Sequence, residues 1–190
     1  MCDPDGLRGP LIIRDNKALS NYGNIQQEVT LALSDMYHVE APYLINWFLS
    51  ANNVAGSEPV PDSALMNEAQ NIRIGMLPGQ TYMFHIINMG ALAGQYLQFD
   101  QHNMTIIEMD GVYTQPYQVS QLFVAVAQRY TVLVTAKSST TTNFAIVSQF
   151  LTDMFDSTIT PPGQQPTVSF PFFLFLPRFS PSLCCRAASC

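Results

Sequence analysis

The chain has 190 residues, of which 47% are hydrophobic and 11% are aromatic, which is enough for one domain with a sizeable core. Charged residues make up 12% of the sequence, about half the usual share. The 8 basic and 14 acidic residues give a net charge of −6. Because no cluster of Lys or Arg is present, the composition argues against nucleic acid or an anionic membrane surface as a partner.

Short segments of alternating or continuous apolar residues, bounded by Gly, Pro, Asn or Asp, predict strands along most of the chain. The expected strands cover residues 10–14, 28–37, 71–76, 80–88, 94–100, 104–109, 119–126, 129–135 and 143–149. Turns are predicted at 77–80 and at Asp110-Gly111. Residues 41–52 fit either a short helix or an aromatic-rich loop. This pattern is typical of an antiparallel β-sandwich or barrel.

The four cysteines lie at the two ends of the chain, as Cys2, Cys184, Cys185 and Cys190. This placement excludes a disulfide framework inside the domain, and it excludes a type 1 copper site, which needs a thiolate flanked by imidazoles. The first ten residues show neither the basic nor the apolar region of a signal peptide. The longest dense apolar run is too short and too rich in proline to span a bilayer.

The three histidines, His38, His85 and His102, are 47 and 17 residues apart. This spacing forms no local metal clip, and the sequence contains no His-x-His pair and no His-Cys-His triplet. Structural roles are therefore expected for all three imidazoles.

Asn103-Met104-Thr105 is a sequon for N-linked glycosylation. It makes Asn103 a candidate modification site, provided that the protein is secreted.

Four segments, residues 5–13, 33–38, 102–111 and 127–134, resemble segments of fungal multicopper oxidases. Residues 5–13 (DGLRGPLII) are similar to the last strand of the first cupredoxin domain in laccases and ferroxidases. Residues 33–38 (LSDMYH) resemble the opening strand of the second domain in the ferroxidase branch. Residues 102–111 (HNMTIIEMDG) and 127–134 (AQRYTVLV) match two runs that both groups share. The resemblance implies an all-β, cupredoxin-like, antiparallel Greek-key β-sandwich or barrel.

The same resemblance implies a division of the chain. Residues 1–20 would be the end of a first cupredoxin domain, and residues 21–160 would form the second plastocyanin-like domain. Residues 161–190 would be a non-domain tail, because the composition changes abruptly over the last 21 residues. Read-through into an intron near Val168 would explain that change.

Residues 56–61 (GSEPVP) resemble an acidic loop of the iron-oxidising members, in which the glutamate binds ferrous iron. Asp156 falls on the position of a second iron-site carboxylate in that branch. The resemblance therefore implies that Glu58 and Asp156 bind substrate iron. The chemistry agrees, because hard carboxylate oxygens favour ferric over ferrous iron and so make the metal easier to oxidise.

The function implied by the resemblance is oxidation of Fe(II) to Fe(III), coupled to reduction of O₂ to water, during iron uptake. In the parent protein the copper ligands would come from the first and third cupredoxin domains, which this chain lacks. An iron permease is the implied partner, and secretion or the extracellular face of the plasma membrane is the implied location. The isolated chain, without copper ligands, is expected to be inactive. The alternatives are a piece of a laccase-like phenol oxidase and a non-catalytic truncated product.

Overall fold

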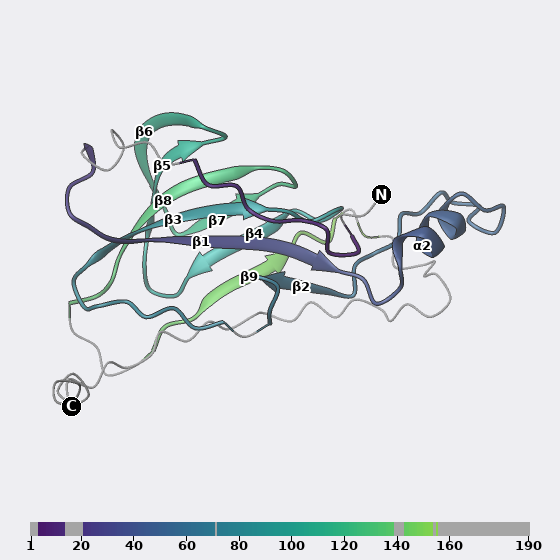
Figure 1. Cartoon of the computed structure of the whole chain (residues 1–190), viewed down its shortest axis with the longest axis horizontal. Helices are drawn as coiled ribbons and strands as arrows, with labels where there is room; N and C mark the ends of the chain where they lie inside the picture. The colour runs from purple at the N-terminus through teal and green to yellow at the C-terminus, as the bar shows by residue number, and fades with distance from the viewer. Residues whose placement is uncertain (1–3, 14–20, 71, 139–142, 154, 156–190) are drawn as a thin grey trace, which may run out of the picture.

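The computed structural model describes residues 4–13, 21–70, 72–138, 143–153 and 155. Within these residues the chain is nearly all β (Figure 1), with nine strands and one short helix. In chain order they are β1 (Ile25–Met36), α2 (Ala41–Phe48), β2 (Ser63–Met66), β3 (Thr81–Asn88), β4 (Gln95–Phe99), β5 (Met104–Met109), β6 (Val112–Val119), β7 (Gln121–Val124), β8 (Arg129–Thr135) and β9 (Ile146–Phe150).

The strands form two sheets, one in the order β2-β1-β3-β8-β5-β6 and one in the order β7-β4-β9. All neighbouring strands are antiparallel except β1 and β3, which run parallel. The expected fold class is confirmed by this nearly all-β arrangement, although the larger sheet is mixed. Parallel neighbours need a crossover connection, and the long segment between β1 and β3, which contains α2 and β2, provides it.

The core lies between the two sheets. Side chains from both sheets are completely or almost completely buried there, including Leu31 and Phe84 from the larger sheet and Leu97 and Phe99 from the smaller one. Phe84 and Phe99 meet edge to face, with ring centroids 4.9 Å apart. Because each such side chain contributes roughly 1.5–3 kcal/mol through burial, the apolar alternation read from the sequence also supplies the main force that holds the sheets together.

Most of the expected strands are confirmed, with small shifts at their ends. Both expected turns are confirmed as well: Gln80 N donates to the Leu77 carbonyl at 3.2 Å, and Asp110 and Gly111 both have positive φ angles in the β5–β6 hairpin. Positive φ at both central positions is what a tight hairpin turn needs, and it explains the Asp-Gly pair. Of the two alternatives for residues 41–52, the structure has a short helix over 41–48.

Two expected strands are wrong. Residues 10–13 form no strand, because Leu11 and Ile13 are more than four-fifths exposed and find no ladder partner. Residues 72–76 also form no strand, although Ile72 and Ile74 are partly buried and pack against the core. Arg14 and Asn71 lie outside the described residues.

Two strands were not expected from the sequence. They are β2, which has only four residues, and β6, whose residues are nearly all exposed and therefore show no apolar alternation. The proposed domain limits at residues 20 and 160 stay predictions. Residues 14–20 and the whole of the expected tail, 161–190, lie outside the described residues.

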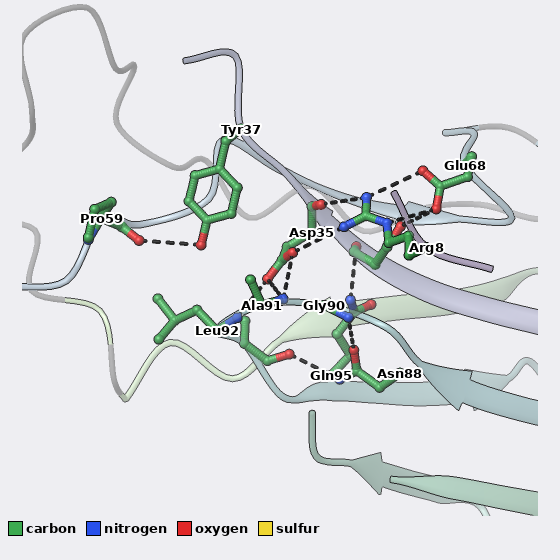
Figure 2. Close-up of polar contacts among 12 residues, drawn as sticks. Arg8, Asp35, Tyr37, Pro59, Glu68, Asn88, Gly90, Ala91, Leu92 and Gln95 are labelled. Carbon is green, nitrogen blue, oxygen red and sulfur yellow. Dashed lines mark hydrogen bonds and ion pairs between the residues drawn. The ribbon is translucent and has the colours of Figure 1, made fainter. Parts of the chain in front are cut away.

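A fully buried carboxylate joins three separate parts of the fold (Figure 2). Asp35, near the end of β1, accepts hydrogen bonds from the backbone N–H groups of Ala91 at 2.8 Å and Leu92 at 2.9 Å. Arg8 lies against it, with Nη1 3.7 Å from Asp35 Oδ1 and Nη2 donating to the Asp35 carbonyl at 2.9 Å. Glu68 holds the other side of the guanidinium, with Oε1 3.1 Å from Arg8 Nε. The N-terminal segment and the segment before β4 are thereby fixed to β1.

We expect Asp35→Ala to lower the free energy of unfolding by about 3–5 kcal/mol, because it removes the carboxylate that faces the buried guanidinium of Arg8 and that accepts the two backbone N–H groups of Ala91 and Leu92. The measurement is urea denaturation of the full chain. Glu68→Gln is the matched control, and it should cost about 1 kcal/mol or less, because Glu68 is half exposed. Equal losses in the two variants would contradict a central role for Asp35.

Candidate functional site

A groove of about 300 Å³ opens beside helix α2, between the helix, the loop that follows it and the segment before β4. Figure 1 shows α2 at one end of the molecule, beyond the ends of the sheets. The groove walls are mostly apolar, with one carboxylate and one phenol. The lining residues are Pro4, Tyr37, Ala41, Leu44, Ile45, Phe48, Glu58, Pro59, Ala91 and Leu92.

Helix α2 forms one wall of the groove and begins with an unusual cap. The residue before it, Glu40, makes no side-chain capping bond. Instead, Asp5 from the N-terminal segment accepts the Ala41 N–H at 2.8 Å. A carboxylate at this end satisfies a free N–H group and complements the positive end of the helix dipole.

Among the described residues, no helix has the length and apolar character needed to cross a membrane.

The loop between α2 and β2 is organised by the buried side chain of Asn53. Its Nδ2 donates to the carbonyls of Phe48 and Ser57, both at 3.0 Å, and its Oδ1 accepts the Ser57 N–H at 3.0 Å. Gly56, at φ +67°, supplies the left-handed turn inside this clamp. The clamp ends directly before Glu58, so the backbone that carries this carboxylate is held in one conformation.

Further contacts fasten the far side of the loop to the end of β1. Tyr37, just after β1, donates its hydroxyl to the Pro59 carbonyl at 3.4 Å (Figure 2). Asp62 accepts the His38 N–H at 2.7 Å, and its own N–H donates to the Met36 carbonyl at 2.8 Å. Burial raises the pKa of Tyr37 well above its usual value, and the nearby carboxylates, including Glu58, raise it further. The phenol therefore stays protonated and remains a donor.

The three candidate residues from the sequence lie in different places. Glu58 is exposed and lines the groove. Asp156 lies outside the described residues. Asn103 is exposed in the turn between β4 and β5, which follows the C-terminal end of β4. The groove residues Ala91 and Leu92 instead precede the N-terminal end of β4. Sequence reasoning did not identify Asn53 or Tyr37, because neither belongs to a spacing motif and their importance comes from contacts with distant backbone groups.

The described residues do not fit a copper centre. Each histidine is engaged separately: His38 Nδ1 lies 3.2 Å from Asp62, His85 Nε2 lies 3.3 Å from Glu28, and His102 Nδ1 lies 2.7 Å from the Asp100 carbonyl. Over the described ranges, no three His, Cys, Asp or Glu side chains come together in an arrangement that could hold a metal ion. The four cysteines all lie outside these ranges.

Comparison with known proteins agrees with the fold and the sequence motifs. A family model described as "Multicopper oxidase" matches residues 27–170, which is more than half of the chain. The chain is 46% identical to the iron transport multicopper oxidase FET3 of Gibberella zeae over 153 residues, which are 80% of this chain and 24% of that protein. It is 38% identical to the iron transport multicopper oxidase FET3 of Saccharomyces cerevisiae over 152 residues, 80% of this chain and 23% of that protein.

Solved structures show the same relationship. The crystal structure of Fet3p, described as a multicopper oxidase that functions in iron import, has a TM-score of 0.74 and 32% identity, and the match covers 93% of this chain and 34% of that one. A laccase from B. aclada, at 20% identity and a TM-score of 0.63, shares the fold. The chain spans about a quarter of the length of the curated relatives it matches. It belongs to the multicopper oxidase family.

Proposed function

We propose that this chain is the substrate-facing part of a longer multicopper oxidase that oxidises Fe(II), and that Glu58 is one of its iron ligands. One observation carries the proposal. A chain 46% identical to an iron transport multicopper oxidase presents an exposed glutamate, on a loop with a rigid backbone, at the rim of a groove.

The setting of Glu58 suits transient binding of a hard cation. The side chain is exposed, so its carboxylate is available to a ligand without the cost of breaking a buried ion pair. Asn53 and Tyr37 fix the flanking backbone, so little conformational entropy is lost when the carboxylate binds. Carboxylate oxygens favour Fe(III) over Fe(II) and therefore promote loss of the electron.

Asp156 is proposed as the second carboxylate. Its described neighbour Phe155 packs against Phe150, with ring centroids 5.7 Å apart, and so joins the small buried cluster that contains Ala93. After β9, Leu151 N donates to the Gly94 carbonyl at 2.8 Å. The chain that leads towards Asp156 therefore runs beside the segment that follows the groove residues Ala91 and Leu92. This route supports the proposal that Asp156 shares a cation with Glu58.

In the longer protein, four Fe(II) ions would give four electrons to one O₂, which takes up four protons and forms two molecules of water. Copper, for which the family is named, would be held by residues outside the described part of this chain. The proposed setting is an enzyme that is secreted or stands on the extracellular face of the plasma membrane, with an iron permease as its partner. The first and third cupredoxin domains would flank the present one.

A phenol oxidase is the second candidate function. The observation that favours it is the apolar wall made by Leu44, Ile45 and Phe48, which suits an aromatic ring better than a hydrated cation. The two candidates differ in what they require of Glu58: iron oxidation needs its charge, whereas a phenol needs mainly the apolar surface.

We expect Glu58→Gln, made in the longer protein that contains this chain, to raise the KM for Fe(II) at least about tenfold, because a neutral amide binds a hard cation far more weakly. Asp156→Asn should act in the same direction. Steady-state oxygen consumption with Fe(II) and, separately, with a substituted phenol measures both activities. Turnover of the phenol should stay within about twofold of the parent protein.

Glu40→Gln and Asp153→Asn are the matched controls, since both are exposed carboxylates: Glu40 directly precedes the groove helix α2, and Asp153 lies three residues before Asp156. Both control variants should retain the parent KM for Fe(II). If Glu58→Gln impairs phenol and iron turnover equally, the proposed iron site is wrong. Loss of phenol turnover alone would favour the second candidate.

Asn53→Ala tests the clamp that holds the Glu58 loop. It removes three hydrogen bonds that tie the backbone of Phe48 and Ser57 to one buried side chain, so we expect a loss of about 2–4 kcal/mol in the free energy of unfolding. In the longer protein the KM for Fe(II) should rise while phenol turnover is unchanged. Ser50→Ala is the control, because its hydroxyl caps the end of α2 without reaching the clamp. An unchanged KM for Fe(II) in a folded Asn53→Ala protein would show that iron binding does not need the clamp.

A further inference from the structure

We propose that Asn103 carries an N-linked oligosaccharide, and that this oligosaccharide lies at the end of β4 opposite to the groove. The first observation is its sequence context: Asn103-Met104-Thr105 is the one N-x-S/T sequon in the 190 residues. The second is its exposure, because the side chain lies at the surface in the turn between β4 and β5. This proposal rests on the secreted setting given under the proposed function, but it does not depend on the identity of the substrate.

The backbone on both sides of Asn103 is anchored in the fold. His102 is 8% exposed, donates its Nδ1–H to the Asp100 carbonyl at 2.7 Å, and meets Phe144 edge to face at 4.8 Å. Met104 is completely buried in the core between the sheets. Asn103 lies between two buried residues, so its side chain points into solvent from a backbone that is anchored on both sides. A sugar attached there extends into solvent and displaces no core contact.

Thr105, the third residue of the sequon, determines when the modification takes place. It lies within β5, opposite Gln118 of β6 and Leu133 of β8. In the folded sheet β5 is hydrogen-bonded to a strand on each side, so the backbone at Thr105 cannot adopt the conformation that a glycosyltransferase would need. The oligosaccharide must therefore be transferred to the growing chain, before β5 pairs with β6 and β8.

The surroundings of Asn103 suit a carbohydrate. Gln101, at φ +56°, turns the chain just before the sequon, and its amide oxygen accepts a hydrogen bond from Lys137 Nζ at 2.9 Å. Both side chains are exposed and polar. Since β4 spans five residues, or about 17 Å, the sugar is well separated from Ala91 and Leu92 in the groove. The glycosylated turn therefore lies on a solvent-exposed surface of this chain away from the groove.

The test is expression of the full chain, behind an added secretion signal, in a eukaryotic host that glycosylates. Peptide mass spectrometry after release by a peptide N-glycosidase in H₂¹⁸O reports conversion of Asn103 to labelled Asp. The analysis includes the microsomal fraction, because transfer precedes folding and so can be detected even if the chain is retained. We expect labelled Asp at position 103, and its loss in Asn103→Gln and Thr105→Ala, with retention in Thr105→Ser.

Recovery of unmodified Asn103 from microsomes and medium alike would overturn the proposal. A second measurement tests the location of the sugar. Without denaturant, the glycosidase should release it from the secreted protein nearly as fast as from the unfolded chain. Release only after denaturation would show that the Asn103 turn is covered, and would overturn its assignment to an open surface.

Discussion

The arrangement around the groove depends on one buried charge, the carboxylate of Asp35. A carboxylate with no exposure to water is tolerated only when donors surround it, and here the donors come from Arg8, Ala91 and Leu92. These residues belong to segments far apart in the sequence. Gly90 permits the close approach, because a Cβ there would stand 3.0 Å from Asp35 Oδ2. Satisfying one carboxylate therefore fixes both the N-terminal segment and the segment before β4.

The groove follows from this constraint. Arg8 holds the N-terminal segment in place, and Asp5 of the same segment caps helix α2. The helix is thus tied to β1 through a part of the chain that has no regular structure of its own. On the other side, Asn53 and Tyr37 hold the loop that carries Glu58. Rigid walls and one exposed carboxylate on a fixed stem are the features that a site for transient cation binding requires.

Sequence reasoning was reliable where one physical rule dominates. Short apolar runs predicted β3 and β8, because a strand buried in the core is rich in apolar residues, and Asp110-Gly111 predicted the β5–β6 turn, because few other pairs tolerate two positive φ angles. Sequence reasoning failed where hydrogen bonding to a neighbouring strand, rather than burial of apolar side chains, decides whether a segment forms a strand. The exposed strand β6 exists because β5 offers it a ladder. Residues 10–13 are apolar, yet no strand offers them a partner.

The sequence by itself determined the β-sandwich class, the family motifs and the candidate residues Glu58, Asp156 and Asn103, since these depend on residue type and local order. Only the tertiary structure decided that Glu58 lines a groove, that Asn103 lies at the far end of β4, and that Asn53 and Asp35 organise the surroundings of the groove. The reason is that a buried polar side chain is satisfied by whichever backbone groups the fold brings to it. Those groups come from distant segments and leave no local pattern.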